Sequence, residues 1–305
     1  MSNFLLLACC LLAGMLLRRT SKLPDDAHST LNAIIIYLSL PALTLHTLHS
    51  FSFDRSQLWP VLMPWALFAL GALAFGVIGR LLGLTRSSIG ALTLVGGLGN
   101  TSFVGLPMIE SLQGRDGLSL GLLIDQLGSY LALSTVGVFA AALYAADGRK
   151  TSLRTIALKV ATFPPFVALV IALLTRPVPL PAVVDEVLIR MGDTLAPLAL
   201  LSVGLQLRFD ALSKQAGALT LGLSYKLVIC PVLVLIVLRL ADANFDVTTS
   251  VTVIEAAMPP MIGAGVVAAQ AKLDAPLVST MIGIGIPIGL STAPAWHWLF
   301  LYLLR

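Results

Sequence analysis

Ten apolar segments, each about long enough to cross a lipid bilayer, constrain this chain more than any other feature. A membrane helix needs roughly 20 apolar residues. The segments cover residues 3–17, 31–48, 58–82, 88–112, 118–146, 156–174, 183–207, 216–240, 247–270 and 277–304. Only 11% of the residues are charged, against about 25% in soluble proteins. The sequence therefore predicts an all-α integral membrane protein with short connections and no soluble domain.

Two of these segments contain residues that interrupt a helix. The fourth contains Gly99-Asn100-Thr101-Ser102-Phe103-Val104-Gly105-Leu106-Pro107, and the ninth contains Glu255-Ala256-Ala257-Met258-Pro259-Pro260. Proline has no N–H group and clashes with the preceding turn, so it frees carbonyl groups. Half-helix N-termini attract anions, and free carbonyls can ligate a cation. Two interrupted helices at corresponding positions of the two halves predict the binding site of a secondary transporter.

A weak internal repeat relates the two halves. Matching residues are displaced by a nearly constant 156–158 positions. The matches are Pro41 with Pro197, Phe53-Asp54 with Phe209-Asp210, Asp116 with Asp274, and Leu133-Ser134-Thr135 with Leu290-Ser291-Thr292. Each half holds five segments, and because five is odd, the second half enters the membrane inverted. We therefore expect inverted repeats over residues 1–146 and 147–305, with Asn100 opposite Ala257 or Met258.

Basic residues predict the orientation in the membrane. Twelve Lys and Arg residues lie near one set of segment ends, and six lie near the other. The twelve are Arg18, Arg19, Lys22, Arg80, Arg86, Arg149, Lys150, Arg154, Lys159, Arg208, Lys214 and Lys272. The positive-inside rule puts these twelve in the cytoplasm, so both termini are expected to be extracellular or periplasmic. The net charge of +4 is then an orientation signal, and we expect no nucleic acid as a partner.

The interrupted segments resemble a known family. The run from Gly99 to Pro107 resembles the Gly-Asn-Thr-x-Phe-x-Gly-x-Pro signature of the auxin efflux carriers, and the second break resembles their Ala-Ala-Met-Pro motif. Lys226-Leu227 followed by Pro231 extends the match. The family's fold, shared with the bile-acid sodium symporters, has two inverted five-helix repeats in which helices four and nine cross. The short connection at 147–155 resembles the compact, bacterial type.

The resemblance also implies an organisation and a class of substrate. Segments one, two, six and seven would form a scaffold and the others a core domain, and the scaffold would support a homodimer. Family members carry malate, malonate or similar acids, or the auxin anion. The expected location is the inner (plasma) membrane, and the expected partners are a small carboxylate and the lipid bilayer.

The candidate substrate ligands are polar side chains and the backbone of the two breaks. They are Asn100, Thr101, Pro107, Met258, Pro259, Pro260 and Lys226. An Asn amide offers two donors and an acceptor, and a lysine ammonium attracts a carboxylate as a point charge. Two other interpretations of Lys226 stay open at this stage, namely pairing with Asp193 and snorkelling to the membrane surface.

Intramembrane carboxyl groups are the candidates for ion coupling, because ionisable residues in hydrocarbon are costly and are usually functional. Glu255 precedes the second break, and resemblance to the sodium symporters implies that it holds Na⁺ or a proton. A neutral, hydrogen-bonded Glu is the alternative. Asp125 and Asp193 are second candidates, although Asp193 lies one turn from Arg190 and could form a structural ion pair. We expect no cofactor beyond Na⁺ or H⁺ as coupling ion.

A secondary carrier of a small carboxylate, working by alternating access, fits these observations best. A channel would need a continuous polar pathway, whereas this sequence offers isolated polar positions. An enzyme is not expected, and neither His-Glu-x-x-His nor a Walker loop is present. The alternatives are a potential-driven anion uniporter or channel, and a sodium-coupled carrier of a larger amphipathic acid.

Overall fold

The regular structure of the chain is helical. The computed structural model describes residues 2–20, 22–24, 26–52, 54–145, 152–207, 216–244 and 246–303. Over these ranges it contains helices and one isolated β-bridge but no strand, which confirms the all-α prediction. Eight residues used in the sequence analysis lie outside the described ranges: Phe53, Arg149, Lys150, Arg208, Phe209, Asp210, Lys214 and Arg305.

Six helical stretches of the described chain are long and apolar enough to cross a membrane. They are Ala27–His49, Arg55–Leu81, Thr101–Tyr144, Ala182–Gln206, Ala216–Leu240 and Ala275–Leu303. A seventh is reached if α9 (Leu153–Ala161) and α10 (Pro164–Thr175), which are bent by 64°, count as one span. Ten crossings stay a prediction, because the first predicted segment is not among these stretches and the fourth and ninth are each interrupted.

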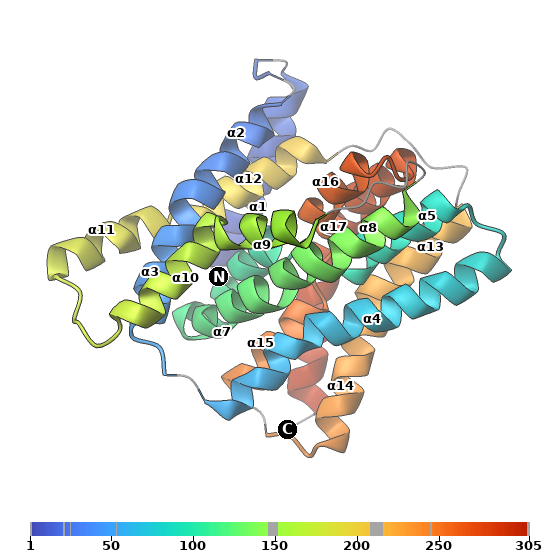
Figure 1. The fold of residues 1–305 in the computed structure, drawn as a ribbon. Coiled ribbons are helices and arrows are strands. Elements are labelled where there is room, and N and C mark those ends of the chain that lie inside the picture. The colour runs from blue at the N-terminus through green and yellow to red at the C-terminus, as the bar shows by residue number, and fades with distance from the viewer. Residues whose placement is uncertain are drawn as a thin grey trace. The chain divides into compact units, whose positions relative to one another are not determined.

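Contacts between residues divide the chain into two compact units. Unit 1 comprises Met1–Asp54, Ser102–Leu122 and Ala157–Leu207. Its helices include α1 (Ser2–Arg19), α2 (Ala27–Ile34), α3 (Leu40–His49), α6 (Leu106–Gln113), α11 (Ala182–Gly192) and α12 (Leu195–Gln206). In Figure 1, α2 lies beside α12. Unit 1 thus groups the segments expected in the scaffold together with residues 102–122, whereas the inverted repeats stay a prediction.

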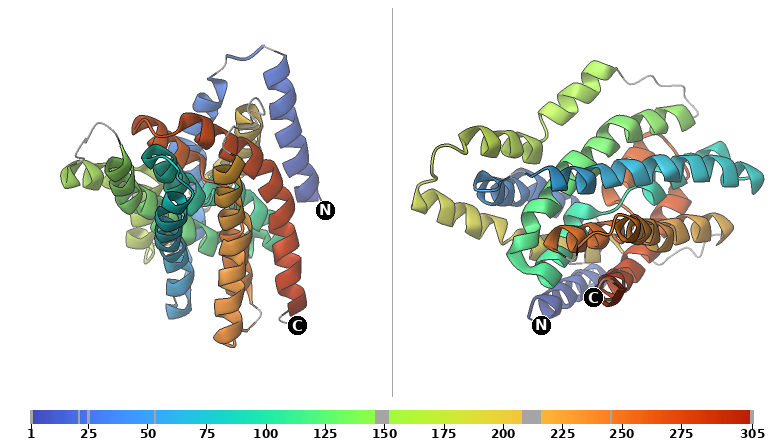
Figure 2. Two further views of the ribbon diagram at one scale, coloured as in Figure 1. Left: turned by 90° about the vertical axis from the view of Figure 1, so that its right-hand side faces the viewer. Right: turned by 90° about the horizontal axis from the view of Figure 1, so that it is seen from below.

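Unit 2 comprises Arg55–Thr101, Leu123–Ile156 and Arg208–Arg305. It contains α4 (Leu58–Leu81), α5 (Arg86–Ala91), α8 (Val138–Tyr144), α13 (Ala216–Ser224), α14 (Cys230–Leu240), α15 (Val247–Ala256), α16 (Ile262–Gln270) and α17 (Ala275–Leu303). The long α17 runs beside α13 (Figure 2). Four π-helical turns, η3 (Leu92–Gly96), η6 (Ile124–Tyr130), η7 (Leu133–Gly137) and η8 (Tyr225–Ile229), interrupt the α-helices described in this unit, as π turns often do near functional sites.

Candidate functional site

Both predicted interruptions are present, and they contact each other within unit 2. Residues 98–100 separate η3 from the π-helical turn η4 (Thr101–Gly105), and residues 257–261 separate α15 from α16. The backbone N–H of Asn100 donates to the Pro259 carbonyl at 2.8 Å, and the N–H of Met261 donates to the Leu98 carbonyl at 3.1 Å. These bonds make Gly99 and Pro260 an antiparallel bridge. Each break therefore satisfies backbone groups that the other leaves free.

Glycines make this close contact possible. A Cβ atom on Gly99 would lie 3.2 Å from Cε and Nζ of Lys226. On α17, a Cβ on Gly285 would lie 2.7 Å from Cδ of Pro260, and one on Gly289 would lie 2.6 Å from Cβ of Pro259. An added Cβ on Gly285 or Gly289 could not fit unless the facing proline moved, whereas one on Gly99 would crowd the end of the Lys226 side chain. The Gly285-x-x-x-Gly289 pair thus receives the two prolines of the second break, as small residues do where membrane helices pack closely.

Lys226 reaches the second break from η8. Its side chain is 2% exposed, and Nζ donates to the carbonyl of Ala256 at 3.1 Å. In a continuous helix that carbonyl would accept an N–H from residue 260, or from residue 259 in a tighter turn. Both positions are proline, which has no N–H. The Pro259-Pro260 pair therefore leaves the Ala256 carbonyl to the ammonium group.

Two further hydrogen bonds fix the turn that carries Lys226. The hydroxyl of Tyr225 donates to the carbonyl of Leu67 at 2.5 Å. Pro231 offers no N–H to the Leu227 carbonyl, and that carbonyl accepts Nε1–H of Trp296 at 2.8 Å. The Ala256 and Leu227 carbonyls, which prolines leave without a helical donor, are thus each taken up by a side chain of another helix.

Two buried carboxyl groups accompany Lys226. Glu255 is 1% exposed, and among the described residues neither of its carboxyl oxygens has a hydrogen-bond partner. It interacts electrostatically with Asp125 and with Lys226. Asp125 is also 1% exposed, and its Oδ1 accepts the Thr101 hydroxyl at 2.5 Å. The structure therefore gathers Asn100, Thr101, Asp125, Lys226 and Glu255 in unit 2, each at most 2% exposed.

Other predicted residues divide between the units. Met258, Pro259 and Pro260 belong to the second break of unit 2, whereas Pro107 lies in the first turn of α6 in unit 1. No group of three or more His, Cys, Asp or Glu side chains within the described ranges is placed to hold a metal ion.

Asp193 has a different partner from the one considered in the sequence analysis. Its Oδ1 lies 2.6 Å from Nη2 of Arg115, within unit 1, and its side chain is 46% exposed. Arg190 instead pairs with Glu186 at 2.5 Å, one helical turn away. The predicted Arg190–Asp193 pair is therefore wrong. Pairing of Lys226 with Asp193 and snorkelling are wrong as well, because Lys226 is buried and bonded to Ala256.

Sequence reasoning missed the residues that position the site. Tyr225, Trp296 and the glycine pair of α17 are not among the site residues that the sequence predicts. Pro231 was the available signal for Trp296, because a proline inside a helix frees a carbonyl that another donor must satisfy. No local signal pointed to Tyr225, whose acceptor lies 158 residues away.

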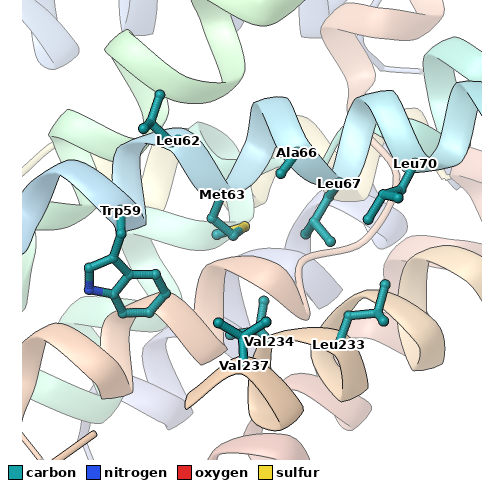
Figure 3. Close-up of a pocket in the computed structure, with 9 residues that line it drawn as sticks. All are labelled: Trp59, Leu62, Met63, Ala66, Leu67, Leu70, Leu233, Val234 and Val237. Carbon is teal, nitrogen blue, oxygen red and sulfur yellow. The ribbon is translucent and has the colours of Figure 1, made fainter. Parts of the chain in front are cut away.

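An apolar groove on unit 2 lies between α4 and α14 (Figure 3). Its volume is about 280 Å³, and it is lined by Trp59, Leu62, Met63, Ala66, Leu67, Leu70, Leu233, Val234 and Val237. Met63 and Leu67 of α4 face Val234 of α14 (Figure 3). Small polar ligands need placed polar groups for orientation, so this groove does not suit a small carboxylate. Its composition is that of a surface in contact with lipid tails.

Apolar helices around a buried, charged site between interrupted segments define an integral membrane transport protein. The chain belongs to the membrane transport protein family, whose model matches residues 1–297, and this confirms the predicted auxin efflux carrier relationship. It is 28% identical over 294 residues to an uncharacterized transporter of Methanothermobacter thermautotrophicus, with 93% of each chain covered. It is 24% identical over 311 residues to an uncharacterized transporter of Methanocaldococcus jannaschii, with 99% of each covered.

Proposed function

We propose that this chain is a secondary active carrier of a small organic carboxylate, malate-like, malonate-like or auxin-like, that works by alternating access. The observation that carries the proposal is the contact between the two breaks beside the buried ammonium of Lys226. Broken helices that meet inside a membrane supply half-helix ends and free backbone groups to a ligand. In this proposal helices four and nine cross at the substrate site.

The substrate carboxylate is bound by the residues around the first break. Asn100 supplies amide donors, Thr101 a hydroxyl, and Lys226 a positive charge, and hydrogen bonds from charged donors to a carboxylate are the stronger ones. The backbone from Met258 to Pro260 completes the proposed site. Because the second break supports Asn100 through the Pro259 carbonyl, a movement of either helix changes the binding geometry.

Glu255 couples transport to a cation, either Na⁺ or H⁺. A carboxylate without a hydrogen-bond partner is too costly to bury unless a positive charge neutralises it, and Glu255 is such a group among the described residues. Asp125 is the second coupling candidate because it lies close to Glu255. Asp193 is the third, and its ion pair with Arg115 would have to open. A homodimer through the scaffold helices completes the proposal.

A thermal-shift screen of small mono- and dicarboxylates, with and without sodium, tests the proposed substrate class. A ligand that binds the folded state raises the unfolding temperature by mass action. At least one acid should stabilise the purified protein, and Asn100→Ala should weaken that acid by about 5- to 150-fold, from a loss of roughly 1 to 3 kcal/mol. Asn244→Ala, on an exposed connection, is the matched control. Wild-type affinity in folded Asn100→Ala would exclude this site.

A further inference from the structure

We propose that the ammonium group of Lys226 is a built-in cation of this carrier. It fills the position at the second break that a free coupling cation would otherwise take, so that the site does not require sodium. The biological meaning of this inference rests on the proposed carrier function. The contacts that support it are independent of that function.

The first support is the carbonyl that Lys226 binds. Ala256 ends α15, and the last carbonyls of a helix have no partner within it. The two following prolines remove the donors that could cap this one, and Nζ takes their place at 3.1 Å. A carbonyl at the C-terminus of a half-helix also carries the negative end of the helix dipole. These are the groups that ligate cations at broken transporter helices.

The second support is the way in which the ammonium is enclosed. It lies against Gly99 of the first break, where a Cβ atom would approach Nζ to 3.2 Å, while it binds the second break through Ala256. Lys226 takes part in none of the ion pairs formed by the described residues. Among the described residues, the ammonium group therefore binds a backbone carbonyl of the second break, lies against Gly99 of the first, and forms no ion pair with a carboxylate.

The third support is the charge of the cluster. Asp125, Lys226 and Glu255 are its ionisable members. With a proton on Glu255, the charges of Asp125 and Lys226 cancel, and no free cation is needed for neutrality. Since the positive charge of Lys226 is covalently tethered, the ion that Glu255 exchanges is a proton. Of the two coupling ions in the proposed function, this inference selects H⁺.

Removing the tethered charge should create a binding site for a free cation. The purified protein is unfolded thermally in NaCl, propylammonium chloride or choline chloride at equal ionic strength, without any carboxylic acid. Lys226→Ala should show a saturable stabilisation by Na⁺ or propylammonium over choline, of about 3 °C at ten times the dissociation constant. Wild type and Lys226→Arg should show none. Lys22→Ala, which removes an exposed lysine, is the matched control.

Lys226→Gln is tested in parallel in case the Ala variant does not fold. Its uncharged side chain is one bond shorter than that of lysine and leaves room for a cation at the Ala256 carbonyl, so a saturable response to Na⁺ is expected. Saturable stabilisation of the wild type by Na⁺ over choline would overturn the inference, and so would variants that respond to neither cation. Because no acid is present, these results are independent of the thermal-shift screen that tests the carrier itself.

Discussion

Gly289→Ala should damage the candidate site although residue 289 is not part of it. The added Cβ would lie 2.6 Å from Cβ of Pro259, about 1 Å closer than favourable carbon–carbon contacts. Overpacking of this kind costs about 1–3 kcal/mol, while replacing a helical glycine by alanine returns at most about 1 kcal/mol. We expect a net loss of stability of about 1–2 kcal/mol.

The same substitution should weaken substrate binding. Pro259 can relieve the clash only by moving, and its carbonyl accepts the Asn100 N–H at 2.8 Å. Weakening that bond by about 1 kcal/mol corresponds to about fivefold in affinity. The assays are thermal unfolding and calorimetric titration with the stabilising acid.

Gly217→Ala is the matched control for this prediction. Gly217 lies in α13, and apart from that helix's own backbone no atom of the described residues lies within 4 Å of its added Cβ. It should therefore leave affinity unchanged and stability equal or slightly higher. If Gly289→Ala behaves like Gly217→Ala in both assays, the second break is not held by α17.

Three further predictions concern coupling, positioning and orientation. Glu255→Gln keeps the size of the side chain, so it should fold, but uptake into proteoliposomes should no longer respond to a proton gradient; a parental response would make Glu255 structural. Tyr225→Phe removes the hydroxyl that donates to the Leu67 carbonyl, so it should lower stability by about 0.5–1.5 kcal/mol and weaken acid binding. Wild-type values in both measurements would show that this bond does not position Lys226. In a cysteine-free background, Ser152→Cys should react with a membrane-impermeant thiol reagent only from the cytoplasm, and Val178→Cys only from outside. The reverse pattern would show that the chain has the opposite orientation to the predicted one.

The positions of the helices could be predicted well from the sequence. The predicted segment 58–82 compares with α4 at Leu58–Leu81, and the segment 216–240 coincides with Ala216–Leu240. In a bilayer, an apolar stretch must satisfy its own backbone, so composition nearly determines secondary structure. The 64° bend before α10 was missed. Its signal was Phe163 before Pro164, because the residue before a proline avoids the helical region, and Phe163 is extended.

The candidate site could be predicted in part. The prolines and the intramembrane charges pointed to the correct breaks, because each is costly in a membrane helix without a compensating contact. The partners across the fold were not predictable from sequence neighbours. Asp193 pairs with Arg115, which is 78 positions away, rather than with nearby Arg190, and Lys226 bonds to Ala256 from 30 positions away. Local spacing gives candidates for ion pairs, whereas tertiary packing chooses among them.

Counterflow in proteoliposomes tests the carrier proposal most directly. Vesicles containing the purified protein are loaded with the unlabelled acid that stabilises it best, diluted into a trace of the labelled acid, and sampled over time. An alternating-access carrier should accumulate the label transiently above its equilibrium level, and Asn100→Ala should lose most of this overshoot. Label that rises only to equilibrium, at a rate independent of the acid inside, would contradict alternating access and indicate a channel.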